Sequence, residues 1–274
     1  MLLALSTLLY INENPQNGVD FSGINTAGIN NVELSFPVHA NELTLKKIYN
    51  QGLKVISGHA DFINMDISSP DKKLRQNSIN IIKERILFLK EAGGKFLVVH
   101  PGDFCQTEEE RSIRLGFSIN SLDEILPYAE KNGVCIAIEN MPNSFLGDSP
   151  AELLYIIEEA RKNISSKDSI GICFDSGHAF LTGTIEIYLN NYLHEIISMH
   201  IHDNFGDVNR DYRYAADDRH LPPGNGCIDW AAFIEKVKKS YMGAFIFEVI
   251  PQQDSNNIVS LLGDIKSFIK QFCL

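Results

Sequence analysis

Short apolar runs alternate with longer amphipathic stretches along the whole chain. Apolar runs of about four to eight residues are typical of buried strands, because a strand covered on both faces needs few polar positions. We predict strands over eight such runs: Leu2–Leu8, Asn31–Phe36, Leu53–Gly58, Lys95–His100, Val134–Glu139, Ser169–Asp175, Ile196–His202 and Ala244–Ile250.

The stretches between these runs carry the pattern of amphipathic helices. Helices are predicted over Lys72–Ala92, Glu108–Lys131, Pro150–Lys162 and Trp230–Ser240. Asp229 is placed to cap the last helix, because its carboxylate can accept hydrogen bonds from the free backbone N–H groups of the first turn. Gly93, Gly94 and Gly133 are predicted to end two of the helices just before the next strand begins.

Strand and helix patterns alternate through eight strands, which predicts an all-parallel sheet closed into an α/β fold of the (β/α)8 TIM-barrel type. An open doubly wound sheet is the alternative, but it usually has a glycine-rich turn after its first strand, and none occurs here. The length of 274 residues suits one barrel, which needs about 250. We expect a single domain over residues 1–274, with a functional loop at Asn204–Cys227, an unusually long irregular stretch.

Polar residues gather at the C-terminal ends of the predicted strands. In a parallel barrel these ends open on one face, where barrel enzymes place their active sites. The residues that end these strands or follow them closely include His59, His100, Glu139, Asp175, His178, His200, His202 and Glu248. His220 lies in the long loop, and His39 and His194 are interpreted as capping or solvated residues.

Three of these side chains are carboxylates that would point into one mouth. Two unit charges about 5 Å apart repel by roughly 3 kcal/mol at an effective dielectric constant near 20. A divalent cation removes this cost, and nearby imidazoles supply the nitrogen ligands that zinc, manganese or iron accept. Because independent strands rarely all end in metal-ligand residue types, the pattern predicts a metal site.

Two local spacings refine the predicted site. Asp175 and His178 stand three residues apart, so one tight turn after a strand presents both. His200 and His202 lie on the same face of a strand, because strand side chains repeat with a period of two. We expect one histidine of this pair to bind metal and the other to contact substrate. The run Leu221–Gly226 predicts a rigid turn behind His220.

Composition and charge narrow the choice of partners. The formal net charge is −11, and no basic stripe with interleaved aromatic residues occurs, which argues against a nucleic-acid partner. A metal-filled cleft would still attract phosphate. The five cysteines are odd in number and lack C-x-x-C spacing, so we expect buried free thiols in a reducing compartment.

The N-terminal run MLLALSTLLYI lacks the basic residues and the cleavage site of a signal peptide, and it is too short to span a bilayer. We interpret it as the first barrel strand of a soluble, cytoplasmic protein with no membrane partner. The sequence does not determine the oligomeric state, for which a homodimer is one option because dimers are common among soluble enzymes.

Seven motifs follow one another in order: GHADFINMDISSPD (58–71), VVHPGD (98–103), IAIEN (136–140), GICFDSGHAF (171–180), MHIHDN (199–204), DRHLPPGNGCIDW (218–230) and FIFEVIP (245–251). With these motifs the chain resembles the xylose isomerase-like TIM-barrel superfamily, which includes sugar-phosphate isomerases and epimerases and also endonuclease IV. The resemblance covers nearly the whole chain. It implies the fold and a metal site, and it leaves the substrate open.

The resemblance to endonuclease IV implies a trinuclear zinc site, which suits phosphodiester hydrolysis because metals activate water and neutralise developing phosphate charge. All nine of its ligand types match here: His59, His100, Glu139, Asp175, His178, His200, Asp218, His220 and Glu248. Phe62 and Ile63 could imitate the DNA-penetrating pair of that enzyme, although packing at an apolar loop is the simpler interpretation. The residues after His200 and after Glu139 differ from those of endonuclease IV.

The resemblance to the isomerases and epimerases implies a simpler site. One metal would be held by Glu139, Asp175, His200 and Glu248, and the two glutamates would exchange a proton with carbon on either face of a sugar. The run His200-Ile201-His202-Asp203-Asn204, followed by His220-Leu221-Pro222-Pro223-Gly224, is most similar to this branch.

The leading hypothesis is therefore a metal-dependent sugar or sugar-phosphate isomerase or epimerase that uses one to three divalent ions, zinc or manganese. Glu139 and Glu248 are its expected catalytic residues, and all nine matched residues are its expected metal ligands. Glu33, His202 and Arg219 are expected to contact substrate. The alternatives are an endonuclease IV-type or phosphatase-like hydrolase and a non-catalytic binding module. The role of the charged segment Arg210–Arg219 stays open between phosphate binding and simple solvation.

Overall fold

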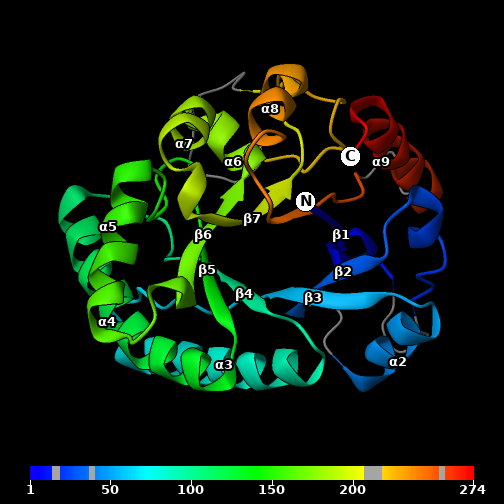
Figure 1. Ribbon diagram of the computed structural model, residues 1–274. Helices are drawn as coiled ribbons and strands as arrows, with labels where there is room; N and C mark the ends of the chain where they lie inside the picture. Colours follow the sequence, from blue (N-terminus) through cyan, green and yellow to red (C-terminus); the bar gives the residue numbers. More distant parts are fainter. Residues whose placement is uncertain (14–18, 37–40, 207–217, 253–256) are drawn as a thin grey trace.

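A computed structural model describes residues 1–13, 19–36, 41–206, 218–252 and 257–274. Its centre is a closed barrel of parallel strands in the order β1 to β8, with β1 paired to both β2 and β8 (Figure 1). The strands are β1 (Leu2–Ser6), β2 (Asn31–Ser35), β3 (Lys54–His59), β4 (Phe96–Val99), β5 (Cys135–Glu139), β6 (Ile170–Asp175), β7 (Ile196–Ile201) and β8 (Ala244–Phe247). The predicted TIM barrel is confirmed.

Helices surround the strands on the outside of the barrel (Figure 1). The α-helices in the described residues are α2 (Glu42–Asn50), α3 (Lys72–Glu91), α4 (Glu108–Asn132), α5 (Pro150–Ala160), α6 (Ser176–Leu181), α7 (Ile185–Asn191), α8 (Trp230–Val237) and α9 (Ile258–Phe272). Short 3-10 helices are η1 (Thr7–Tyr10), η2 (Ile24–Ala27), η3 (Arg161–Asn163), η4 (Lys167–Ser169) and η5 (Leu193–Glu195). Among the described residues, every helix is too short or too polar to form a membrane span.

The predicted boundaries agree with the structure to within a few residues, and the caps explain several of them. Asp229 caps α8 by accepting a hydrogen bond from the backbone of Ala232. Gly133 ends α4 in the left-handed conformation at φ 69°, which costs glycine little. The first strand is shorter than predicted because the Ser6 side chain accepts from the backbone of Leu8 and begins η1.

The strand residues divide into two sets by their alternation. One set packs outward against the helices and builds the main core, as Leu97, Ile138 and Phe247 do. The other set forms two small clusters inside the barrel, made of Ala4, Ala244 and Ile246, and of Val98, Ala137 and Cys173. Because this interior is filled with side chains at its lower levels, a ligand has room only above them, at the C-terminal ends of the strands.

All five cysteines are free, as expected for a chain without a disulfide framework. The expectation that all are buried is wrong for Cys135, which is half-buried, and for Cys227 and Cys273, which are exposed. Cys227 stands just beyond the turn that follows His220, and Cys273 ends α9 in the left-handed conformation, so neither residue belongs to a packed strand. In the long loop, residues 207–217 lie outside the described residues, and with them most of the segment Arg210–Arg219.

Candidate metal centre

Side chains alternate along each strand, so the inward-facing set of strand residues continues up to the mouth of the barrel. Two positions after an interior apolar residue, the chain places a carboxylate or an imidazole. This relation joins Val98 to His100, Ala137 to Glu139, Cys173 to Asp175 and Ile246 to Glu248. The same alternation that fills the barrel therefore points these four polar side chains inward at its upper end.

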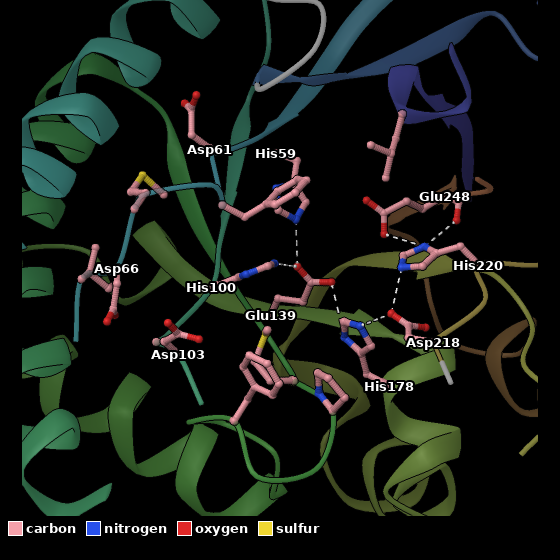
Figure 2. Close-up of a pocket in the computed structure, with 18 of the residues that line it drawn as sticks. His59, Asp61, Asp66, His100, Asp103, Glu139, His178, Asp218, His220 and Glu248 are labelled. Atoms are coloured by element: carbon pink, nitrogen blue, oxygen red, sulfur yellow. Dashed lines mark hydrogen bonds and ion pairs between the residues drawn. The ribbon is translucent and has the colours of Figure 1, made fainter. Parts of the chain in front are cut away.

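Glu139, at the end of β5, lies at the centre of the convergence. Its Oε2 is 3.1 Å from Nε2 of His59 and 3.2 Å from Nε2 of His100. Its Oε1 is 3.2 Å from Nδ1 of His200 and 3.8 Å from Nδ1 of His178. Figure 2 shows the carboxylate between histidines that come from different strand ends. Both of its oxygens thus face nitrogen atoms that could share a cation with it.

His200, on β7, lies close to two further carboxylates, those of Glu248 and Asp175. Its Nδ1 is 3.2 Å from Oε2 of Glu248 and 3.9 Å from Oδ2 of Asp175. The side chains of His200 and Asp175 are fully buried, and Glu248 is almost so. Burying the three carboxylates of Glu139, Asp175 and Glu248 around this one nitrogen is costly unless positive charge compensates them.

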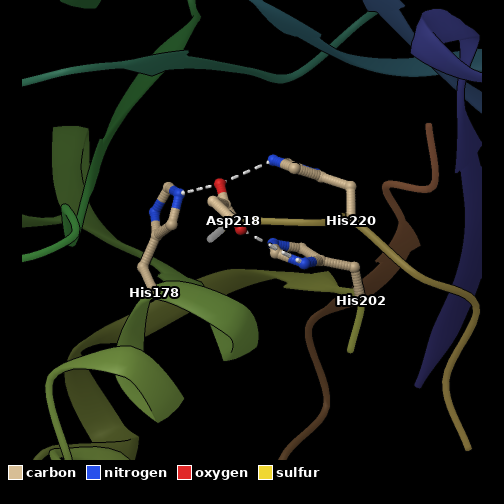
Figure 3. Close-up of side chains that lie close together, drawn as sticks. All are labelled: His178, His202, Asp218 and His220. Atoms are coloured by element: carbon tan, nitrogen blue, oxygen red, sulfur yellow. Dashed lines mark hydrogen bonds and ion pairs between the residues drawn. The ribbon is translucent and has the colours of Figure 1, made fainter. Parts of the chain in front are cut away.

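A further group lies on the other side of the mouth. Oδ2 of Asp218 is 2.9 Å from Nε2 of His178 and 2.9 Å from Nε2 of His220 (Figure 3). The ring of His202 stacks on that of His220 with 3.9 Å between the ring centroids. Nε2 of His202 is 2.9 Å from Oδ2 of Asp175, so His202 lies between this group and the one around His200.

The nine residues matched in the sequence come together in the structure. Within each of the following groups, one possible ligand atom per residue lies within 4.8 Å of the others: His59, His100 and Glu139; Glu139, Asp175, His200 and Glu248; His59, His200 and Glu248; and His178, His202, Asp218 and His220. Oxygen and imidazole donors in such sets suit zinc or manganese. The residues present therefore fit one or more divalent ions.

Burial and mutual charge perturb these groups strongly. Burial opposes protonation of His59, but its hydrogen bond to Glu139 and the charges of Glu139 and Glu248 raise the pKa of His59 to about 9. Burial also opposes protonation of His220, yet Asp218 raises its pKa to about 9. Burial would raise the pKa of Glu248, but the charge of His200 holds it well below its usual range. Without an ion, protonated His59 and His220 supply positive charge to the carboxylates around them.

Asp203 is a supporting residue that sequence reasoning missed. Its buried carboxylate accepts hydrogen bonds from the backbone of Asn204, Gly224 and Ile228 and from Nε1 of Trp230, at 2.9, 2.9, 3.1 and 2.7 Å. It thereby joins the end of β7 to the loop that carries Asp218 and His220. The motif His-x-His-Asp-Asn contains this aspartate, but its role depends on donors about 20 to 27 positions later.

Two asparagines orient the acidic side chains. Nδ2 of Asn204 donates to Oδ1 of Asp218 at 3.0 Å, and its Oδ1 accepts from the backbone of Arg219. Asn140 accepts from the backbone N–H of Asp175 at 2.7 Å and donates to its carbonyl at 3.1 Å. Each amide thus fixes the backbone or the carboxylate of a candidate ligand, which restricts the carboxylate to few orientations.

A cavity of about 310 Å³ opens above the centre. Seven of the nine candidate ligands line it, while Asp175 and His200 lie deeper. The rest of its wall combines three carboxylates that the sequence had not singled out, Asp61, Asp66 and Asp103, with apolar side chains such as Phe62 and Phe145. Among the described residues that line the cavity there is no lysine or arginine. The volume is that of a small-molecule site.

None of the three residues expected to contact substrate lines this cavity. Glu33, on β2, and His202, just beyond the end of β7, are fully buried and do not line the cavity. Arg219 is exposed, and its backbone, rather than its side chain, makes the hydrogen bonds that hold it, to Asn204 and Gln252. A contact between any of these side chains and a ligand in the cavity therefore has no support in the described geometry.

A closed parallel barrel with grouped His, Asp and Glu side chains at its C-terminal mouth defines a class: TIM-barrel proteins with a candidate metal centre. Residues 21–265 match the model of the family described as xylose isomerase-like TIM barrel. The chain belongs to this family, so the resemblance carried by its motifs is confirmed.

Relatives by sequence include proteins of two kinds. The uncharacterised protein MJ1311 of Methanocaldococcus jannaschii is 34% identical over 197 residues, which make up 69% of this chain and 62% of that protein. A probable endonuclease 4 of Aquifex aeolicus is 26% identical over 210 residues, covering 72% of this chain and 71% of that protein. The chain spans 62%, 65% and 49% of the lengths of the first three curated relatives that it matches.

Similar solved structures extend over the whole barrel. A D-tagatose 3-epimerase-like protein is 26% identical, with a TM-score of 0.76 and coverage of 100% of this chain and 97% of that one. The IOLI protein, solved with a zinc atom, has a TM-score of 0.80 at 20% identity and covers 99% and 98% of the two chains. The second likeness shows the fold alone.

Proposed function

We propose that this chain is a metal-dependent isomerase or epimerase that acts on a small sugar or sugar phosphate. The observation that carries the proposal is the pair Glu139 and Glu248. They come from β5 and β8, two strands of the barrel that are not neighbours, and each places one oxygen 3.2 Å from Nδ1 of His200. Both also line the cavity. Two carboxylates thus flank one candidate ion position and face the space where a substrate would lie.

Glu139, Asp175, His200 and Glu248 would hold the principal ion. A bound divalent cation polarises a carbonyl oxygen and neutralises the negative charge that develops on it. His59, His100, His178, Asp218 and His220 would hold a further ion or ions, or orient the substrate.

The two glutamates would carry out the proton transfer. One carboxylate removes a proton from the carbon beside the carbonyl group, and a carboxyl group returns a proton to the substrate. If the proton returns to the opposite face of the same carbon, the configuration of that carbon is inverted. If it returns to the neighbouring carbon, formerly the carbonyl carbon, the carbonyl group moves. General acid–base catalysis of this kind contributes about 10²–10⁴-fold.

The cavity supports a small substrate over a nucleic acid. Its volume of about 310 Å³ is at the lower end of the range for small-molecule sites. Asp103 adds negative charge near its wall, which disfavours the approach of a polyphosphate backbone, whereas Asp61 and Asp66 are paired with Arg85 and Arg114. Full-length similarity to a D-tagatose 3-epimerase-like protein supports the same choice.

A phosphoester hydrolase with two or three ions is the second candidate. One observation favours it: His178, Asp218 and His220 form a group of ligand type distinct from the group around His200. A proton-transfer enzyme needs one ion, while several ions at one mouth suit the activation of water and the stabilisation of a phosphate leaving group. Relatives named probable endonuclease 4 support this candidate as well.

Solvent exchange of substrate carbon-bound hydrogen is the test of the leading proposal. The metal-loaded protein is incubated in D2O with a panel of aldoses, ketoses and their phosphates, and deuterium incorporation and product are followed by NMR. Incorporation by the wild-type protein that is lost in Glu139→Gln and Glu248→Gln would support the proposal. Parallel samples contain an abasic DNA duplex and a phosphodiester of p-nitrophenol.

The outcomes separate the candidates. Deuterium exchange without phosphoester cleavage supports the isomerase or epimerase. Cleavage without exchange supports the hydrolase and overturns the leading proposal. Binding of a sugar without either reaction, under every divalent ion tried, would instead indicate a non-catalytic binding module.

A further inference from the structure

Glu33, on β2, is buried inside the barrel below the candidate metal centre. Its side chain has no exposed surface and does not line the cavity. Its Oε2 accepts a hydrogen bond from Oγ of Ser57 at 2.9 Å. Its Oε1 is 3.0 Å from Nε2 of His200, and no closer basic partner exists among the described residues. The carboxylate of Glu33 therefore faces one side of the His200 imidazole.

The burial of the Glu33 carboxylate has a cost in free energy that some interaction must offset. Removing an unpaired charge from water costs several kcal/mol, and an apolar side chain of similar size would fill the space without that cost. The single hydroxyl of Ser57 satisfies one oxygen only. Neither Oε1 of Glu33 nor Nε2 of His200 makes a hydrogen bond of standard geometry with any described residue, and their own contact is an ion pair at 3.0 Å. The two atoms have only each other at ion-pair distance.

The two nitrogens of His200 face different partners. Nδ1 faces the carboxylates of Glu139 and Glu248, where the proposed ion would lie, and Nε2 faces Glu33. An imidazole that donates the lone pair of Nδ1 to an ion carries its proton on Nε2. Oε1 of Glu33, 3.0 Å from Nε2, is the nearest carboxylate oxygen to that proton, and a rotation of the carboxylate would bring it into line with the N–H group.

We infer that Glu33 is a positioning residue that acts through His200: it fixes the proton of His200 on Nε2 and strengthens Nδ1 as a metal ligand. Carboxylates that hold the second nitrogen of a ligating histidine generally raise the basicity of the ligand and fix the orientation of the ring. This inference rests on the metal centre proposed above and adds to it a residue outside all the candidate ligand groups. It also replaces the expectation that Glu33 contacts substrate.

The test compares ion affinity in matched variants of the whole chain. Glu33→Gln keeps the size of the side chain and removes its charge. We expect it to bind Zn²⁺ about 10–100-fold more weakly than the wild type, in titration calorimetry of the chelator-treated protein. Ser198→Ala is the control, because Ser198 is equally buried on the strand of His200 and its hydroxyl has no partner among the described residues. It should bind with wild-type affinity.

A spectroscopic signature distinguishes positioning from general stability. The visible absorption of bound Co²⁺ depends on the ligands around it. We expect Glu33→Gln to shift the Co²⁺ spectrum, while Ser198→Ala leaves it unchanged. Unaltered Zn²⁺ affinity and an unaltered Co²⁺ spectrum in Glu33→Gln would overturn the inference. If the wild type itself binds no divalent ion, the proposed metal-dependent function fails instead, so the two failures are distinguishable.

A measurement on the wild type keeps the inference testable if Glu33→Gln does not fold. In NMR spectra of ¹⁵N-labelled protein loaded with Zn²⁺, the inference requires a proton on Nε2 of His200 that is strongly deshielded and exchanges slowly with water. A proton on Nδ1, or an Nε2 proton without these signs of a hydrogen bond, would overturn it.

Discussion

Glu139 and Glu248 each hold a carboxylate oxygen 3.2 Å from the same atom, Nδ1 of His200. The two residues are separated by 109 positions in the sequence (139 to 248) and come from strands on different sides of the barrel. Their approach depends on the closure of the sheet. It also creates a concentration of buried negative charge that a divalent ion would relieve, and the following predictions depend on this arrangement.

Removing the charge of Glu139 should disrupt the centre strongly, since its Oε2 faces His59 and His100 while its Oε1 faces His200. We expect Glu139→Gln to lower the rate of any turnover found by about 10²–10⁴-fold and to weaken divalent-ion binding. Steady-state kinetics and metal analysis check this. Glu235→Gln, at an exposed position of α8, is the control and should be neutral. Full activity in Glu139→Gln would contradict the assigned role.

Asp218→Asn tests whether the group on the other side of the mouth takes part in the chemistry. If the enzyme is an isomerase or epimerase with one principal ion, its rate should change by less than about 10-fold, because Asp218 belongs to a different ligand group from His200. If it is a phosphoester hydrolase, the loss should exceed about 100-fold, the scale of removing one electrostatic stabiliser of the transition state. Rate measurements on both substrate classes, with ion stoichiometry, check the prediction.

Asp203→Asn should destabilise the fold. An amide can replace the carboxylate toward two of its four donors, but its NH2 group would face the other two. Leaving buried donors without an acceptor costs about 1–3 kcal/mol, so we expect a loss of about 3 kcal/mol in the free energy of unfolding. Denaturant unfolding measures this. Asp264→Asn, which affects a single exposed hydrogen bond to Asn225, is the control.

The metal-free protein should lose stability as the pH rises from about 6.5 to about 9. In the folded state, burial opposes protonation of His59 and His220. Glu139 and Asp218 outweigh this effect and raise the two pKa values to about 9. Between the unfolded pKa and this value the folded chain binds more protons than the unfolded chain. The stabilisation is therefore complete below about pH 6.5 and is lost through pH 9. Thermal unfolding at several pH values tests the sign, and stability that rises over this range would refute it.

Removing bound metal should lower the melting temperature at neutral pH. An ion that binds only the folded state stabilises it by about 4 kcal/mol when its free concentration is 1,000 times its dissociation constant. Thermal scans with EDTA and after readdition of Zn²⁺ or Mn²⁺ check this. Because the ion replaces protons on the imidazoles, the loaded protein should also depend less on pH over the range above. A melting temperature that is identical with EDTA and with either ion would speak against the proposed centre.

The order of apolar and polar positions along the chain was enough to predict the barrel and the kinds of residue at its mouth. The spacing of apolar residues within a short segment indicates whether the segment is a strand or a helix. Eight strands and four helices could therefore be predicted to within a few residues. The position of His100, Glu139, Asp175 and Glu248 at strand ends follows from the same pattern, since parallel strands put those ends on one face.

Which of these residues meet depends on how the strands are paired around the closed barrel. Register around the barrel is irregular, with shifts between Val32 and Glu33 in the pairing of β2 with β3 and between Ile172 and Cys173 in the pairing of β6 with β7. A period along one strand carries no information about such offsets between strands. For this reason Glu33 was expected to contact substrate, yet the closed barrel turns it under His200, and Asp203 shows its role only through the loop that folds back over it.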